Sequence, residues 1–184
     1  MKRSIFKKVA IATIAVTMCA TTVVGQDQTF GKGDNVINLG IGFGGSWYSG
    51  YGFGWNGVTR LPTLSLSYEH CIVGSLWDDR SSIGVGGQFG YTRIKWKDSD
   101  WRISNTTIGV RGALHYAFVD KLDTYAGLMM GYKIVSDNSD WNYKNQFVSD
   151  YYLGARYYFS DNFAAFAELG YYWSLLNIGV SLKF

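Results

Sequence analysis

The amino-acid sequence predicts an all-β fold, and specifically an eight-stranded antiparallel transmembrane β-barrel. From about residue 30 onward, apolar residues alternate with small or polar ones at the period of two that an extended strand requires. The alternating segments are about ten residues or longer, whereas strands of globular proteins average about five or six residues. A strand that crosses the hydrocarbon of a membrane at a tilt needs about 9 to 11 residues.

The first 25 residues are predicted to be a secretory signal peptide, and residues 26–184 a single outer membrane β-barrel domain. The leader has four basic residues and no acidic ones, followed by an apolar run from Val9 to Ala20 and then by small residues. The apolar run is shorter than the roughly 20 residues of a membrane-spanning helix. Cleavage fits after Ala20 or after Gly25, and we favour Gly25 because the sequence turns polar from Gln26 onward.

The net charge and the cysteine content bear on possible partners and on disulfide bonding. Four of the 17 basic residues lie in the leader, so 13 basic and 14 acidic residues remain after cleavage and the net charge is −1. The basic pI of the whole chain therefore gives no reason to expect a nucleic-acid partner. Cys19 lies in the leader, where Thr17 and Met18 are a poor match to a lipoprotein acylation site. Cys71 is then the only cysteine left, which excludes an intramolecular disulfide.

Eight strands follow from the period of two. Their predicted ranges are 35–45, 61–72, 82–94, 105–118, 122–134, 147–159, 163–172 and 175–184.

The connections between these strands alternate in length. Segments 46–60, 95–104 and 135–146 are long and rich in Trp, Tyr, Asp, Asn and Ser, whereas the connections near residues 120 and 161 are tight turns. Short turns at one end and long loops at the other are typical of outer-membrane barrels. Two connections fit less well, because the one at 73–81 is long for a periplasmic turn and the one at 173–174 is short for an outer loop.

One face of most strands is apolar and the other is small or polar. The interior of an eight-stranded barrel has little room, and the apolar side chains are too many and too bulky to fill it. We therefore expect them to face lipid and the polar face to line the lumen. The alternative is a secreted lipocalin-like barrel that carries an apolar ligand inside. In the strand 122–134, Leu128, Met129 and Met130 leave either facing open.

The last strand, 175–184, alternates strictly and ends on Phe184. Closing the barrel, so that no backbone group is left unpaired in lipid, requires this strand to pair with the first one, 35–45.

The segments LPTLSLSYEHCIVG, IGVGGQFGY, IGVRGALHYAF and LDTYAGLMMGY, together with the terminal Phe184, resemble the outer membrane β-barrel domain proteins of Bacteroidota type, a branch of the OmpA/OmpX-like, porin-family eight-stranded barrels. The resemblance covers essentially the whole mature chain. It implies a location in the cell outer membrane of a Gram-negative bacterium. It also implies that Phe184 is a recognition signal for the outer-membrane insertion machinery. It supplies no catalytic residues.

Four charged residues project from the polar faces of different strands: Glu69, Arg111, Arg156 and Glu168. Charges in a narrow lumen usually pair, because an isolated buried charge is costly. Gly154 is expected opposite Glu168, which makes Arg156 a diagonal neighbour of that glutamate. We interpret the four residues as a lumen charge network, with the alternative that it also gates a small pore.

Aromatic residues gather in the three long loops, and the main candidates for loop contacts are Trp47, Tyr48, Trp55, Trp101 and Trp141. One interpretation is that they anchor the protein in the headgroup region, as aromatic belts of membrane barrels do. The other is that they form an exposed surface for a glycan or protein ligand.

No pattern in the sequence indicates an enzyme, a cofactor or a metal site. GIGFGG at residues 40–45 has the spacing of a dinucleotide loop, but no helix follows to hold a phosphate. His70 and His115 are placed toward the periplasmic strand ends, away from the loops where surface chemistry would take place. The functional expectation is a small integral barrel with a structural or minor pore role, or alternatively a surface adhesion module. We expect a monomer in contact with outer-membrane lipid and lipopolysaccharide.

Overall fold

The computed structural model describes residues 29–45, 58–97, 102–137, 144–172 and 174–184. The predicted leader, residues 1–25, lies outside the described residues. So do all five aromatic loop candidates: Trp47, Tyr48, Trp55, Trp101 and Trp141. Among the described residues, no helix is long and apolar enough to cross a membrane.

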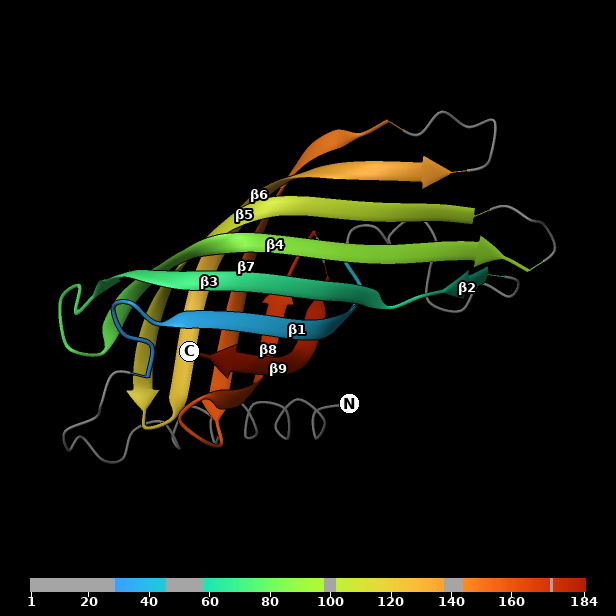
Figure 1. The fold of residues 1–184 in the computed structure, drawn as a ribbon. Helices are drawn as coiled ribbons and strands as arrows, with labels where there is room; N and C mark the ends of the chain where they lie inside the picture. Colours follow the sequence, from blue (N-terminus) through green and yellow to red (C-terminus); the bar gives the residue numbers. More distant parts are fainter. Residues whose placement is uncertain (1–28, 46–57, 98–101, 138–143, 173) are drawn as a thin grey trace, which may run out of the picture.

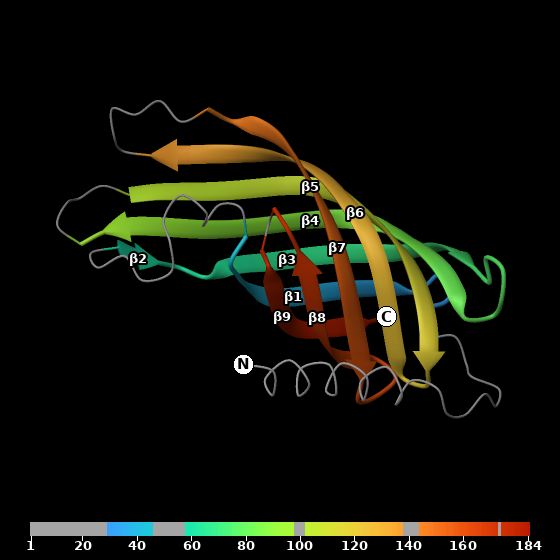
Figure 2. The same ribbon diagram turned by 180° about the vertical axis from the view of Figure 1, so that it is seen from behind.

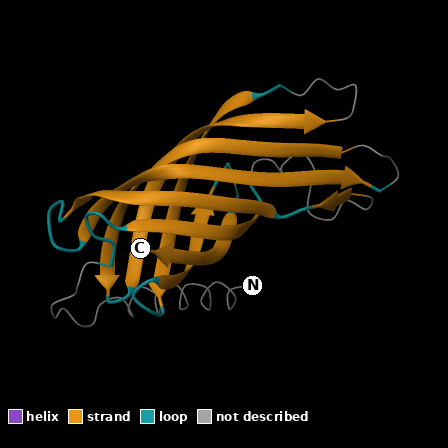
Figure 3. Cartoon of the chain, in the orientation of Figure 1, coloured by secondary structure: helices purple, strands orange, loops and turns teal. Residues whose placement is uncertain are grey.

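The described residues form nine antiparallel strands, drawn in Figures 1, 2 and 3. Their bounds are β1 Asn35–Phe43, β2 Val58–Arg60, β3 Thr63–Gly74, β4 Ser81–Trp96, β5 Arg102–Val119, β6 Leu122–Asp137, β7 Gln146–Tyr158, β8 Phe163–Gly170 and β9 Leu176–Lys183. The seven predicted strands outside 61–72 agree with these bounds to within three residues. The predicted strand 61–72 corresponds to β3, and the short β2 lies before it, in the segment 46–60 that was predicted to be a loop. Pro62, which lacks a backbone N–H, lies between β2 and β3.

Eight of the strands close into a ring in the order β1, β3, β4, β5, β6, β7, β8, β9 and back to β1. The closing pair is β1 with β9, which runs from Val36 opposite Lys183 to Phe43 opposite Leu176. The backbone N–H of Phe184 also donates to the carbonyl of Asn35 at 2.9 Å, and the reverse bond measures 3.0 Å. The prediction of an eight-stranded antiparallel barrel closed by its terminal strands is confirmed.

The two faces of the strands carry the chemistry predicted for a membrane barrel. Outward side chains are apolar and largely exposed, as with Leu39 at 60% and Val110 at 67%, whereas inward Asn38 and Arg111 are 2% and 4% exposed. This is the reverse of a water-soluble barrel, which would bury its apolar face. The facing of β6 is also settled, because Met129 is buried inside while Leu128 and Met130 point outward.

The barrel wall is uneven in length. The strands β4, β5 and β6 have 16, 18 and 16 residues, whereas β1, β8 and β9 have only 9, 8 and 8. Figures 1 and 2 show that the long strands project well beyond the short ones on the side of the long loops. The short β2 extends this wall by pairing with the far end of β4, where Thr59 lies opposite Lys95. One side of the barrel therefore carries a raised sheet.

The connection between β3 and β4, predicted to be long for a periplasmic turn, is compact. Ser75 adopts a left-handed conformation with φ of 53°. Asp78 Oδ1 accepts a bond from the backbone N–H of Arg80 at 3.1 Å, and Oδ2 accepts one from the hydroxyl of Tyr116 at 3.1 Å. These hydrogen bonds within the turn and to β5 hold the long connection in a compact conformation.

Glycines on the inner face make room for large side chains of the lumen. A Cβ atom on Gly154 would overlap the Tyr125 ring, one on Gly127 would overlap the Tyr152 ring, and one on Gly84 would overlap the Glu69 carboxylate. The lumen is thus filled by a few large polar and aromatic side chains that occupy gaps left by glycine.

Candidate functional site

The inward faces of five strands bring a set of charged and aromatic side chains together inside the barrel. The set comprises Glu69 from β3, Arg111 and His115 from β5, Asp123 and Tyr125 from β6, Tyr152 and Arg156 from β7, and Glu168 from β8. All eight are less than 9% exposed. Their hydrogen bonds divide them into two layers, which we call the central layer and the periplasmic layer.

The central layer is built around the ion pair of Arg111 and Glu168. Arg111 Nη2 donates to Glu168 Oε1 at 2.7 Å, and Arg111 Nε donates to the hydroxyl of Tyr152 at 3.0 Å. The Tyr125 hydroxyl donates to the same Glu168 oxygen at 2.9 Å. The guanidinium carbon of Arg111 also lies 4.2 Å from the Tyr152 ring centroid, in cation–π contact. The pair is therefore held in place by two tyrosines from the neighbouring strands β6 and β7.

The periplasmic layer holds two carboxylates and two nitrogen bases. Arg156 donates from Nη1 to Asp123 at 3.0 Å and from Nη2 to Glu69. His115 lies between the same two carboxylates, with Nε2 at 2.7 Å from Glu69 and Nδ1 at 2.9 Å from Asp123. An imidazole donates from both nitrogens only when it carries both protons. With His115 protonated, the layer has two negative and two positive charges and is neutral.

The segment before β1 closes the periplasmic end beneath this layer. Phe30 is 2% exposed, and its ring centroid lies 4.5 Å from that of His115. Phe30 packs in a buried cluster with Val36 and Cys71. Lys183 Nζ fixes the segment by donating to the carbonyl of Thr29 at 3.1 Å. Thr29 and Phe30 therefore form a floor that closes the periplasmic end of the lumen.

One hollow among the described residues on the extracellular side of the central layer is small. A hollow of about 10 Å³ lies among Gln88, Met129, Asp150, Tyr152, Glu168 and Ser174. This is near the minimum volume that holds one water molecule. At this level, a solute would have to displace the side chains of the central layer.

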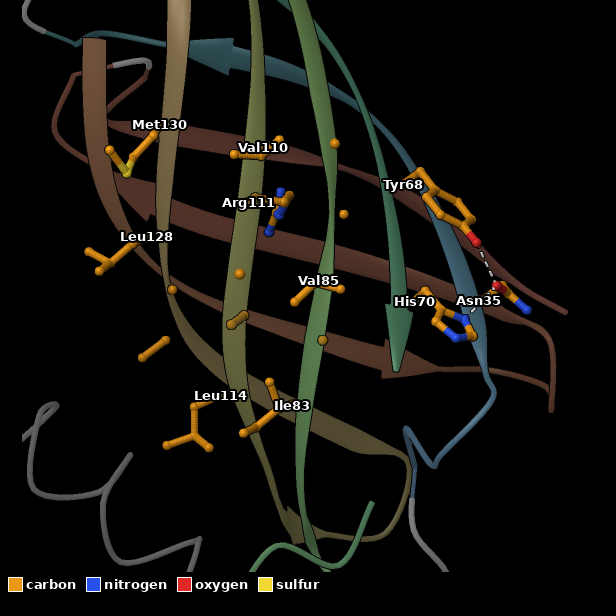
Figure 4. A pocket seen from close by; sticks show the side chains of 17 residues that line it. Asn35, Tyr68, His70, Ile83, Val85, Val110, Arg111, Leu114, Leu128 and Met130 are labelled. Carbon is orange, nitrogen blue, oxygen red and sulfur yellow. Dashed lines mark hydrogen bonds between the residues drawn. The ribbon is translucent and has the colours of Figure 1, made fainter. Parts of the chain in front are cut away.

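A larger open groove lies on the outer wall, shown in Figure 4. Its lining includes Val85, Val110, Leu128 and Met130, and outward Gly112 has no atom within 3.7 Å of a Cβ position. At its edge, Asn35 Oδ1 accepts a bond from the Tyr68 hydroxyl at 2.6 Å and lies 3.0 Å from Nδ1 of His70. The groove faces the region occupied by acyl chains in a membrane.

All four lumen charges predicted from the sequence lie in the barrel interior, but one predicted contact is different. The diagonal pair of Arg156 with Glu168 is replaced by two separate pairs, because Glu168 bonds Arg111 and Arg156 bonds Glu69 and Asp123. The reason is Tyr125, whose ring lies 4.5 Å from the Arg156 guanidinium carbon while its hydroxyl bonds Glu168. The tyrosine therefore stands between the two residues.

Sequence reasoning missed His115 and Asp123 as members of the network, and it missed Phe30 entirely. The two histidines lie on opposite faces, His115 inside and His70 outside. The signal for Asp123 was present, since it has the same odd-numbered parity in β6 as Tyr125. Because the sequence left the facing of that strand open, Asp123 was not assigned to the lumen. Phe30 lies before the first strand, where no periodicity applies.

Comparisons with known proteins agree on the fold. No protein-family model matches the sequence, and no curated protein sequence matches it. The barrel is similar to the outer membrane protein OprG of Pseudomonas aeruginosa, with a TM-score of 0.54, 11% identity, and coverage of 86% of this chain and 99% of that one. It is similar to Ail, the attachment invasion locus protein of Yersinia pestis, in complex with the heparin analogue sucrose octasulfate (TM-score 0.53, 15% identity, 83% and 99% coverage). A third similar structure is the N-terminal barrel domain of Pseudomonas aeruginosa OprF (TM-score 0.50, 17% identity, 84% and 99% coverage).

These similarities and the ring of antiparallel strands define the class. The chain is an eight-stranded antiparallel transmembrane β-barrel of the kind found in outer-membrane proteins.

Proposed function

We propose that the chain is a small integral protein of the outer membrane whose barrel is a structural mount with a sealed lumen, and at most a minor pore. The observation that carries this proposal is the pair of buried charge layers, Arg111 with Glu168 and Arg156 with Glu69 and Asp123. Together with Phe30, they fill the lumen of the described barrel with side chains.

The energetics of the two layers favour a closed barrel. Leaving one partner of a buried ion pair unpaired costs about 3–5 kcal/mol, and a cost of that size corresponds to an open population between roughly one part in 10² and one part in 10⁴. A solute must pass both layers, so openings are expected to be rare and brief. This supports occasional small conductance rather than general diffusion.

Single-channel recording of the refolded chain in planar bilayers tests the proposal. We expect a quiet membrane with rare, small current steps. Glu168→Gln weakens the partner of Arg111 and should increase the frequency of those steps, whereas Leu128→Gln on the outer wall should not. A stable conductance comparable to that of large porins would contradict the sealed lumen.

The cellular location follows from the same proposal. We propose that residues 1–25 are removed and that the barrel inserts as a monomer, with Phe184 recognised by the outer-membrane insertion machinery. The side chain of Phe184 is 60% exposed at the end of the barrel, so it is accessible to a partner. The Bacteroidota-type assignment belongs to this proposal as well, and it is supported by the quoted sequence segments. Heat-modifiable gel migration and extraction only by detergent are the expected results, and full solubility in buffer would contradict them.

A second function, display of a binding surface on the loops, is favoured by the raised wall. The long strands β4, β5 and β6 extend beyond the short β1, β8 and β9. Ail, whose structure contains a heparin analogue, has a similar fold, although at this identity the likeness extends to the fold alone. Binding of whole cells to glycan and host-protein arrays, with and without shortening of loop 46–60 to a tight turn, tests this function. Lost binding with intact insertion would favour it, and unchanged binding would leave Trp47 and Trp55 as membrane anchors.

A further inference from the structure

The groove on the outer wall, shown in Figure 4, has a floor of small residues that no neighbouring side chain fills. Gly87 of β4, Gly112 of β5 and Ala126 of β6 form this floor and follow a diagonal across three paired strands. A Cβ atom on Gly87 would have no atom closer than 3.7 Å, and one on Gly112 none closer than 3.8 Å. The volume of the groove is about 1140 Å³, whereas small-molecule pockets usually have about 300–1,000 Å³. The groove is therefore large enough for an organic ligand.

Large apolar side chains border the floor on both sides. Val110, Leu128 and Met130 lie on the side of the long loops and are largely exposed. Ile83 and Leu114 lie on the periplasmic side, as Figure 4 shows. None of these five side chains carries a hydrogen-bonding group, and the same is true of the floor. This part of the groove is therefore suited to an apolar chain.

One edge of the groove, in contrast, carries three polar side chains. Asn35 Nδ2 donates to the carbonyls of Gly33 and Phe184 at 3.1 and 3.2 Å, which fixes the orientation of the amide. Asn35 Oδ1 then accepts a bond from the Tyr68 hydroxyl at 2.6 Å and lies 3.0 Å from His70 Nδ1. Because Oδ1 can only accept, Nδ1 of His70 carries the proton. In the neutral imidazole, Nε2 is then an acceptor.

This polar edge lies at the level of the periplasmic headgroups. The strand β1 has 9 residues, about the number that a tilted strand needs to cross the hydrocarbon. Its first residue, Asn35, lies opposite His70 and follows shortly after exposed Lys32. Gly87 and Gly112 lie six and seven residues from the periplasmic ends of β4 and β5, which is about 14–16 Å of height at a tilt of about 45°. That height is just over half of the apolar band of about 25 Å, so the groove covers the depth of one leaflet.

We propose that the groove binds one glycerophospholipid of the periplasmic leaflet, with an acyl chain along the floor and a headgroup N–H or O–H that donates to Nε2 of His70. This inference rests on the proposed function, because it requires the barrel to lie in a membrane. A second copy of the chain fits the groove less well. A symmetric pair would place groove against groove, and two facing hollows leave a void that forfeits packing contacts. A flexible acyl chain fills the hollow instead.

Native mass spectrometry of the full mature chain tests the proposal. The protein is refolded in detergent micelles that contain equal amounts of phosphatidylethanolamine and phosphatidylcholine with the same acyl chains. Choline has methyl groups where ethanolamine has N–H donors, so only phosphatidylethanolamine can donate to His70. We expect a complex with one lipid, in which phosphatidylethanolamine is in about two- to tenfold excess, the factor that one hydrogen bond supplies.

Two variants separate the site of the acyl chain from the headgroup contact. Gly112→Leu fills the floor and should reduce the one-lipid complex about fivefold or more for both lipids, since a leucine occupies the space of the chain. His70→Phe keeps a ring but removes the acceptor, so the ratio of the two lipids should fall close to one while phosphatidylcholine still binds. Ala167→Leu is the matched control, because it adds an outward leucine on β8, outside the groove. It should change neither the amount of bound lipid nor the ratio.

Equal lipid binding by the native sequence and Gly112→Leu would indicate unselective contact with the wall and would overturn the proposal. An unchanged lipid ratio in His70→Phe would overturn it as well. So would a dimer that Gly112→Leu abolishes, because a second copy would then cover the groove. Failure of the native sequence to refold in micelles, as followed by heat-modifiable gel migration, would instead contradict the membrane function itself.

Discussion

The lumen and the outer wall of this barrel are built from alternate residues of the same strands, yet different forces determine their arrangement. The outer wall is a continuous apolar surface in which Leu39, Val110 and Met130 are mostly exposed to the surroundings. The lumen depends on specific partners, such as Arg111 with Glu168 and Tyr125 with the gap at Gly154. The comparison teaches that the wall requires only a residue class, whereas the lumen requires particular residues.

The largest effect is expected from Arg156→Met in the lumen. The change leaves Glu69 and Asp123 facing each other across His115 without the arginine that bonds both. Removing one partner from a buried ion pair costs about 3–5 kcal/mol. Urea unfolding of the protein in lipid vesicles measures this loss. Lys144→Met, which removes an exposed cation, is the control and should change stability by less than about 0.5 kcal/mol.

The next largest effect is expected from a charge placed on the outer wall. Val110→Arg puts an arginine into the middle of the apolar band, where it costs about 2–4 kcal/mol. Val110→Leu keeps the residue class and should be nearly neutral in the same vesicle unfolding assay. If the arginine variant were as stable as the native protein, the outer wall would not be in contact with hydrocarbon.

Two glycine substitutions compare the two faces with the same chemical change. Gly154→Ala adds a methyl group that overlaps the Tyr125 ring, and overpacking of this kind costs about 1–3 kcal/mol. Gly112→Ala adds the same group on the outer wall, where the nearest atom is the Gly84 carbonyl oxygen at 3.8 Å. The unfolding free energy should fall only for Gly154→Ala. Equal losses would mean that the lumen is no more tightly packed than the wall.

The last expected effect is on access to the lumen rather than on stability, and it is tested with Phe30→Ala. Cys71 is buried beside Phe30 and Val36, so a thiol reagent should alkylate it slowly in the folded barrel. Removing the Phe30 ring opens the periplasmic floor and should accelerate alkylation, as followed by mass spectrometry. Phe184→Ala, which truncates an exposed aromatic at the same end, is the control. Fast alkylation of the native protein would contradict a closed floor.

The difference between the outer wall and the lumen explains which features could be predicted from the sequence. Alternation alone predicts the strands and the closing pair of β1 with β9, because a strand between lipid and lumen must change residue class at every position. Where both neighbours are apolar, as at Met129 and Met130, alternation gives no answer and packing decides. The partner of Arg156 depends on Tyr125 across a hydrogen-bonded neighbour strand. The place of Phe30 depends on a segment without periodicity, so neither could be derived from spacing.

The central claim is that one face of each strand contacts lipid while the other lines a sealed lumen, and fluorescence quenching tests it most directly. In a Cys71→Ser background, Val110→Cys and Ala113→Cys would each carry a fluorophore on β5, on the outward and the inward face respectively. The protein is refolded in vesicles of lipids with brominated acyl chains, which quench only fluorophores in contact with hydrocarbon. We predict strong quenching at position 110 and little at position 113. Equal quenching at both positions, or stronger quenching at 113, would contradict the account.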